Sequence, residues 1–255
     1  MSDIEHSLER VSEWGKRNLV EFNPSKTQVC AFTTKKFPFV VAPHFRNTPL
    51  SISKSIGILG VDISSDVQFR SHLENKVKLA SRKLGVLNRA KQYFTSRQRL
   101  LLYKSQVRPH VEYCSHIWAG APRYQLNPFD SVQRRAVRIV DDPDLTNGLE
   151  HLSLRRDIGS LCVFYRLYNG ECSKELFDLV PTSRFYHRTA RHRGGVHPHF
   201  LDPGWARTVR FRRMFLPRTL GMWNELPPEV FPMRYNMGLF KGRVKKVLSR
   251  SATRP

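Results

Sequence analysis

Residues 95–118, TSRQRLLLYKSQVRPHVEYCSHIW, carry the longest helical pattern of the chain. Thr95 followed three residues later by Gln98 forms a capping box, which marks the start of a helix. Apolar side chains then recur at steps of three and four, which predicts one buried helix face made of Leu100, Tyr103, Val107, Val111, Cys114 and Trp118. Pro109 lacks a backbone donor and crowds the preceding turn, so a kink is expected there.

Three further segments carry the same helical periodicity. One stripe comprises Phe69, Leu73, Val77, Ala80, Leu84 and Leu87, after a cap at Ser65 or Asp66. The next comprises Phe129, Val132, Gln133, Ala136 and Val140, with Arg134, Arg135 and Arg138 facing outward. The last comprises Leu154, Ile158, Leu161, Tyr165 and Tyr168, with Gly170 as the C-terminal cap. Four stripes predict a mainly α protein built around a helical bundle.

Two short segments before the bundle favour β-structure. Residues 14–32 have the pattern of a helix end, a turn started by Asn23-Pro24 and an edge strand over 27–33, with Lys26 at the exit of the turn. The apolar run 56–63 is short and contains two glycines, which favours a strand pairing with 27–33. An ordinary buried strand with a bulge is the alternative for 56–63. A small β-hairpin region is therefore expected ahead of the helices.

The charge of the chain is strongly positive and unevenly distributed. The 255 residues contain 43 Lys and Arg against 21 Asp and Glu, a formal net charge of +22. Residues 184–255 hold 16 basic and 3 acidic side chains, a net +13, whereas residues 1–183 hold 27 and 18, a net +9. This step predicts one boundary, at 183/184, before a basic, partly irregular region 184–255. Basic residues interleaved with aromatic ones indicate a nucleic-acid partner, with a merely solvated face as the alternative.

Several classes of protein are disfavoured by composition. No apolar run approaches the ~20 residues of a membrane span, and residues 1–20 lack the apolar core of a secretory signal. We therefore expect an intracellular protein of the nucleus or cytoplasm, without a membrane partner. The cysteines, Cys30, Cys114, Cys162 and Cys172, lie far apart without a C-x-x-C pair, so neither a disulfide scaffold nor a Cys-rich zinc site is expected.

A histidine-rich segment near residue 190 resembles a metal site only in composition. Its histidines, His187, His192, His197 and His199, follow no helical spacing, and Gly194-Gly195 and Pro198 interrupt them. The interleaved Arg188, Arg191 and Arg193 make phosphate contact the simpler interpretation. A partly disordered loop is the competing interpretation, and no metal site is predicted.

Five groups of residues, in order along the chain, resemble one protein family. They are Trp14, Asn18-Leu19, Phe22-Asn23 and Lys26-Thr27; then Leu59-Gly60-Val61; then the helical strings around Leu84–Leu87, Leu101–Trp118 and Val132–Ile139; then Thr208–Arg210 and Phe215–Thr219; then Trp223-Asn224-Glu225-Leu226-Pro227 and Phe240–Val244. Together they resemble reverse transcriptases of non-LTR (LINE-type, jockey-like) retrotransposons, over some 250 residues.

The resemblance implies that the chain corresponds to the part of a reverse transcriptase that follows the fingers and most of the palm. Residues 1–64 would be a palm remnant, 65–183 a thumb-like bundle and 184–255 the C-terminal region. Leu59, Gly60 and Val61 match the primer-grip hairpin, although Asp62 comes earlier than the family spacing. Lys26 matches a lysine near the incoming nucleotide's phosphates, and a solvated turn lysine is an equal alternative for this chain.

Polymerase chemistry requires two palm carboxylates that hold two divalent ions. Asp141-Asp142 resembles the usual carboxylate box, but it ends a helical stripe, precedes Pro143 and follows the primer-grip segment instead of preceding it. We therefore interpret the pair as helix-terminal residues. The chain alone is predicted to be inactive as a polymerase and to need no cofactor, with Mg²⁺ expected only for a full-length parent enzyme.

The predicted activity is non-specific binding of RNA and DNA, as template–primer or element RNA, through the sugar–phosphate backbone. The candidate contacts are Arg134, Arg135, Arg138, Arg188, Arg191, Arg193, Arg210, Arg212, Arg213, Lys241, Arg243 and Lys245. A domesticated or unrelated basic scaffold of a ribonucleoprotein or chromatin complex, and a degenerate copy without function, are the alternatives. The sequence predicts no oligomeric state.

Overall fold

The computed structural model describes residues 3–33, 42–181, 198–202, 204 and 207–252. The chain divides into two compact units, residues 1–73 and 74–255. The first unit is nearly neutral, with 9 Lys and Arg against 7 Asp and Glu, whereas the second holds 34 against 14, a net +20. The functional boundaries expected at 64/65 and 183/184 remain predictions.

The first unit combines one helix with short β-structure. Its elements are α1 (Asp3–Arg17), the 3₁₀ turn η1 (Pro24–Lys26), β1 (His44–Phe45), β2 (Thr48–Pro49), β3 (Ser55–Ile58) and β4 (Val61–Ser64). The turn expected at Asn23-Pro24 is confirmed, because the Asn23 side chain accepts a hydrogen bond from the Ser25 backbone N–H at 2.9 Å. Pro24 suits the first position of this turn because its ring fixes φ.

The strand pairing expected in this unit is wrong. The run 56–63 folds back on itself as the antiparallel hairpin β3–β4, with Ile58 opposite Val61. Leu59 and Gly60 form its tip with positive φ angles of 47° and 79°, so the second glycine of the run supplies a tight turn. The expected edge strand makes one described bridge, between Val29 and Ile52.

Helix α2 (Arg70–Arg89) runs from the first unit into the second. Its expected face is confirmed, since Leu73, Ala80, Leu84 and Leu87 are buried. The cap expected at Ser65 or Asp66 is wrong. The helix begins four residues later than Asp66, and the preceding turn is closed by Ser64, whose hydroxyl accepts a hydrogen bond from the Gln68 backbone N–H at 3.1 Å.

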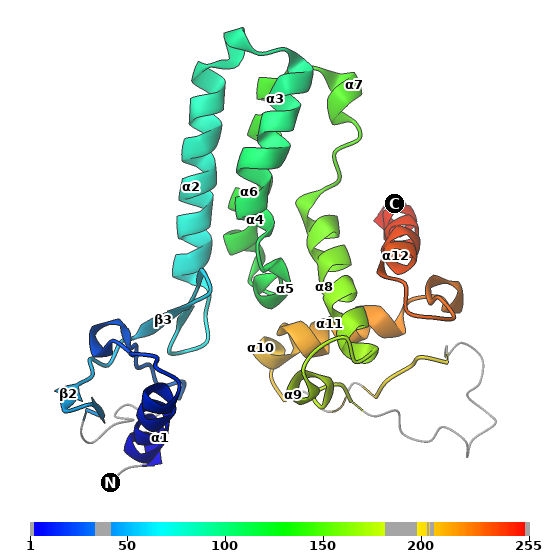
Figure 1. Ribbon diagram of the computed structural model, residues 1–255. Coiled ribbons are helices and arrows are strands. Elements are labelled where there is room, and N and C mark those ends of the chain that lie inside the picture. Colours follow the sequence, from blue (N-terminus) through cyan, green and yellow to red (C-terminus); the bar gives the residue numbers. More distant parts are fainter. Residues whose placement is uncertain (1–2, 34–41, 182–197, 203, 205–206, 253–255) are drawn as a thin grey trace. The chain divides into compact units, whose positions relative to one another are not determined.

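Every regular element in the described part of the second unit is a helix, so the mainly α prediction is confirmed. After α2 come η2 (Lys91–Tyr93), α3 (Ser96–Leu102), the π-helical turn η3 (Tyr103–Val107), α4 (Arg108–Glu112), α5 (Ser115–Trp118), α6 (Arg123–Val140), α7 (Pro143–Thr146), α8 (Leu152–Tyr168), α9 (Lys174–Phe177), α10 (Val209–Arg212), α11 (Phe215–Asn224), η6 (Pro228–Val230) and α12 (Met237–Ala252). Helix α3 packs on α6, and α8 packs on α4, α5, α11 and α12 (Figure 1). Within the residues described, no helix has the length and apolar character to span a bilayer.

The stretch 95–118 forms the predicted buried face but not one continuous helix. The Thr95–Gln98 capping box is present, and Leu100, Tyr103, Val107, Val111 and Trp118 are buried. The expected kink at Pro109 takes the form of a π-helical turn, in which the Arg108 N–H donates to the Tyr103 carbonyl. A wider turn suits a proline that can neither donate nor approach the preceding turn closely. Cys114, with φ of 50°, then separates α4 from α5.

The remaining two stripes are also confirmed. In α6 the residues Phe129, Val132, Gln133, Ala136 and Val140 are all buried. In α8 the residues Ile158, Leu161 and Tyr165 are buried, and the helix is followed by Gly170 with φ of 71°. Glycine adopts this left-handed conformation without strain, as its expected capping role requires.

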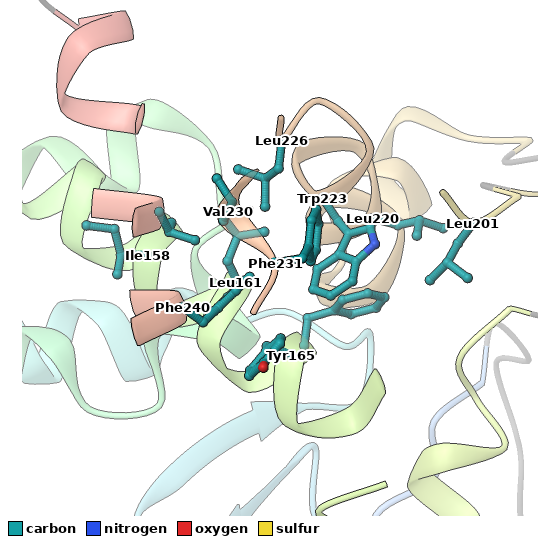
Figure 2. Packing of buried hydrophobic residues seen from close by; sticks show 12 residues of the cluster. Ile158, Leu161, Tyr165, Leu201, Leu220, Trp223, Leu226, Val230, Phe231 and Phe240 are labelled. Carbon is teal, nitrogen blue, oxygen red and sulfur yellow. The ribbon is translucent and has the colours of Figure 1, made fainter. Parts of the chain in front are cut away.

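The segment after residue 198 is integrated into the second unit. Its side chains join those of α8 in one core of Ile158, Leu161, Phe164, Tyr165, Leu201, Leu220, Trp223, Leu226, Val230, Phe231, Phe240 and Val244. Figure 2 shows the Trp223 indole among these residues. The centroid of its ring lies 4.7 Å from that of Phe231. Residues 207–252, expected in a partly irregular region, are thus mostly helical and packed.

Candidate nucleic-acid interface

The outward face of α6 presents the first group of candidate contacts. Arg134, Arg135 and Arg138 are exposed, while the opposite face of the same helix is buried. Helical periodicity explains this arrangement, because the apolar stripe occupies one side of the helix and leaves the arginines on the other. The Arg134 guanidinium donates to the Ser131 hydroxyl at 2.7 Å, which orients its side chain along the helix.

Helix α10 presents the second group. Arg210, Arg212 and Arg213 are exposed, and Thr208 caps this short helix by accepting a hydrogen bond from the Phe211 N–H at 3.1 Å. The C-terminal end of α10 lies against the end of α5, where the Gly120 backbone meets the Arg213 carbonyl. Phe215, two residues later, packs edge-on against the His116 ring, with centroids 5.4 Å apart.

The basic residues of helix α12 fall into two groups: some face solvent and others make contacts within the fold. Lys241 is exposed. Arg243, in contrast, donates to the Glu229 carbonyl at 2.9 Å, and Lys245 forms an ion pair with Glu150. Of the three residues predicted here, the geometry leaves Lys241 available and engages the other two in holding α12 in place.

A second set of arginines lies inside the helical unit and is paired with acids. Arg155 bridges Glu112 and Glu150, and it donates to Glu150 at 3.0 Å. Burial tends to raise the pKa of Glu150, but hydrogen bonds and charge from Lys245 and Arg155 outweigh burial and lower that pKa. Ion pairs therefore link α4, α8 and α12: Arg155 of α8 contacts Glu112 of α4, and it shares Glu150 with Lys245 of α12.

Arg218 anchors α11 in the same way. Its guanidinium donates to Asp157 at 3.1 Å and to the Ser160 hydroxyl at 2.8 Å. Burial raises the pKa of Asp157 and lowers the pKa of Arg218, because desolvation of each charge outweighs their attraction. Arg156, also buried, lies 3.9 Å from Asp130.

Among the residues that the structure describes, these pairings leave the outward arginines without acidic partners. Each of four acids, Glu112, Asp130, Glu150 and Asp157, forms an ion pair with Arg155, Arg156 or Arg218. Among the described residues, no ion pair involves Arg134, Arg135, Arg138, Arg210, Arg212, Arg213 or Lys241. Their positive charge is therefore available to an external anion.

The candidates in the first unit lie on turns. Lys26 is the last residue of η1 and is exposed. Leu59 and Gly60 form the tip of the β3–β4 hairpin, and Val61, the first residue of β4, is buried. Three further candidates, Arg188, Arg191 and Arg193, lie outside the described residues, as do His187, His192 and His197.

The Asp141-Asp142 pair caps helices, as predicted. Asp141 ends α6 in the left-handed conformation, and Asp142 begins α7 by accepting a hydrogen bond from the Leu145 N–H at 3.1 Å. The Asp142 carboxylate is therefore engaged in capping α7. No cluster of three or more potential metal ligands occurs within the part of the chain that the structure describes.

The internal arginine network was not foreseen from the sequence. Arg156 follows Leu152 by four residues and precedes Ser160 by four, so it occupies the buried face of α8 with them. A buried arginine of this kind can be recognised in a sequence because it falls on the same helical repeat as the buried apolar residues. Its acidic partner, Asp130, lies on another helix, and no pattern in the sequence identifies it as the partner.

The chain is similar to two curated proteins of Drosophila melanogaster. It is 27% identical over 225 residues to the probable RNA-directed DNA polymerase from transposon BS, a match that covers 86% of this chain and 23% of that protein. It is 24% identical over 190 residues to the probable RNA-directed DNA polymerase from transposon X-element, covering 72% of this chain and 19% of that protein. No family model and no solved structure matches the chain. The similarity supports a reverse transcriptase-related protein that spans less than a quarter of the length of these relatives.

Proposed function

We propose that the chain is the thumb-like and C-terminal part of a non-LTR, jockey-like reverse transcriptase, and that it binds nucleic acid without reading its sequence. Its ligands are the template–primer duplex and the element RNA, in the nucleus or cytoplasm. The similarity to transposon RNA-directed DNA polymerases supports this assignment at the level of the protein class. The charge distribution of the second unit supports the binding activity.

The observation that carries the proposal is the division of the arginines into two sets. Internal cations such as Arg155 and Arg218 use the acids of the bundle, whereas the arginines on α6 and α10 have no acidic partner recorded in the described residues. A stable fold does not require such a surface, because unpaired like charges repel one another. A phosphate backbone provides the missing counter-charge.

Binding of this kind depends steeply on salt. Each neutralised phosphate releases condensed counterions, so the logarithm of affinity falls with the logarithm of salt at about 0.9 per contact on duplex DNA. If about six phosphates are neutralised, affinity should fall by roughly 10³ between about 50 and 200 mM salt.

The test changes charge without changing the core. Arg134, Arg135 and Arg138 are replaced together by Gln, and binding to a fluorescent duplex is measured over a salt series. The slope should fall by about 2.7, which corresponds to three lost contacts. The matched control replaces Arg10, Lys16 and Arg17 on α1 by Gln. These three residues are also exposed, so the control removes the same amount of charge.

Two outcomes contradict the proposal: a salt-independent affinity, or equal losses from the α6 variant and the α1 control. Deletion of residues 184–255 is not a usable test, because it removes Trp223 and Phe240 from the core. Charge-neutralising variants avoid that loss of folding.

A further inference from the structure

The face of α6 next to its arginines contains a shallow groove shared with α2. The groove has a volume of about 460 Å³ and is lined by Val77, Ser81, Tyr124, Asn127, Pro128, Ser131, Val132 and Arg135. On α6 the lining positions follow the repeat 124, 127, 128, 131 and 135, which keeps them on one side of the helix. On α2, Val77 and Ser81 are one turn apart. All of these residues belong to the second unit.

The groove is aromatic at one end, apolar in the middle and cationic at the other end. Tyr124 lies at one end with 66% of its surface exposed, and the Gln125 amide donates to its hydroxyl at 3.1 Å. Val77 and Val132 provide an apolar floor, and Arg135 lies at the other end. No acidic residue lines the groove.

Polar groups that can bond to a ligand lie between these ends. The Ser81 hydroxyl and the Asn127 amide have no hydrogen-bond partner recorded among the described residues. Pro128 lies inside α6 and has no N–H, so it cannot donate the helical hydrogen bond to the Tyr124 carbonyl. The groove thus contains both donors and acceptors beside an exposed ring.

We propose that this groove holds a short unpaired segment of nucleic acid, with a base stacked on Tyr124 and the following backbone at Arg135. The inference rests on the nucleic-acid binding proposed above and specifies where an unpaired strand binds. Stacking on an exposed aromatic ring requires a free base face, which a duplex hides within its own stack. Tyr124 and Arg135 are 11 positions apart on the helix, roughly 16 Å along its axis, so the segment is longer than one nucleotide.

The experiment compares two probes on the full chain. One is a fluorescent single-stranded RNA of about 15 nucleotides, and the other is a duplex of the same length and sequence. Tyr124→Ala should weaken single-strand binding by at least about fivefold, the lower end expected for one stacked base, and leave duplex binding within about twofold. Tyr124→Phe keeps the ring and should bind like the parent. The matched control is Tyr93→Ala, since Tyr93 is 76% exposed and lies in η2, outside the groove.

A second pair of variants tests the groove without altering the tyrosine. Ser81→Glu places a negative charge in the groove, whereas Ser105→Glu places the same charge on an exposed position of η3. Single-strand affinity should fall more for Ser81→Glu than for Ser105→Glu.

The inference is overturned if Tyr124→Ala weakens both probes equally or weakens neither while the parent chain binds the duplex. In that case the proposed backbone binding stands. If the parent binds neither probe, both the inference and the proposed function fail. Melting curves of each variant establish that the exposed substitutions leave the fold intact.

Discussion

A side-chain carbon added at Gly120 would lie 1.7 Å from the carbonyl oxygen of Arg213. This distance is far inside van der Waals contact, and the obstacle is backbone rather than a flexible side chain. Gly120 therefore permits the close approach of the ends of α5 and α10, which holds Arg210, Arg212 and Arg213 against the helical unit.

Gly120→Ala should destabilise the chain by about 1–3 kcal/mol, the usual cost of overpacking. The end of α10 must move to admit the methyl group, so binding through the α10 arginines should weaken as well. Chemical unfolding and nucleic-acid affinity measure the two effects. Gly221→Ala is the control, because its position in α11 has free space around it and alanine favours a helix interior by about 1 kcal/mol. Equal stability of the two variants would contradict the close-contact interpretation.

Trp223→Ala should cost on the order of 3–5 kcal/mol of unfolding free energy, as for a large aromatic leaving a core. The Trp223 side chain is fully buried, and its indole N–H donates to the His199 carbonyl at 2.8 Å. Trp118→Ala should behave similarly, because Trp118 is buried and stacks on Phe129 of α6. Trp14, which is 53% exposed, provides the control substitution.

An unchanged melting temperature in Trp223→Ala, together with a loss of RNA affinity, would show instead that this tryptophan stacks on bases. The buried position in Figure 2 favours the first outcome.

The two aspartates after α6 should respond in opposite directions to substitution. Asp142→Ala removes the cap of α7 and should cost about 1 kcal/mol. Asp141→Gly should be neutral or stabilising, because φ of 55° is a left-handed conformation that glycine adopts freely. Thermal melting of each variant gives the sign of each change.

The purified chain should extend no primer on primed RNA with nucleotides and Mg²⁺ or Mn²⁺. Extension that Asp141→Asn abolishes would show that the pair binds metal, and the helix-cap interpretation would then be incomplete.

Stability should decrease in acid because of Glu150. The folded-state pKa of this carboxyl is lowered, so its contribution is present above the ordinary value of 4.5 and is lost as pH falls through the folded value. Urea unfolding across this range should show the decline, and Glu150→Gln should reduce its steepness. Glu225→Gln, which removes the same charge at an exposed position, is the matched control.

The helical part of the fold was predictable because each stripe repeats every three or four residues over several turns. The stripe ending at Trp118 identified the buried residues correctly but not the break at Cys114, since periodicity records the direction of side chains and not the continuity of the backbone. The hairpin at Leu59-Gly60-Val61 was expected from the family resemblance, but the residue pattern alone predicted one strand paired with 27–33, because a short run rich in apolar residues and glycine fits either one strand or two short ones around a turn.

The candidate interface was partly predictable for a similar reason. The outward position of Arg134, Arg135 and Arg138 follows from the stripe on the opposite face of α6. The engagement of Lys245 by Glu150 depends on a contact between distant segments, which no local pattern encodes.

The division between internal and outward arginines has an evolutionary consequence. Arg155 contacts both oxygens of Glu112 and reaches Glu150 as well, a forked geometry that a lysine ammonium cannot reproduce. For the phosphate binding proposed above, the outward positions on α6 require only positive charge, which lysine supplies equally well. Across descendants of a common ancestor, arginine and lysine should therefore exchange freely at 134, 135 and 138, whereas position 155 should change only together with its carboxylate partners.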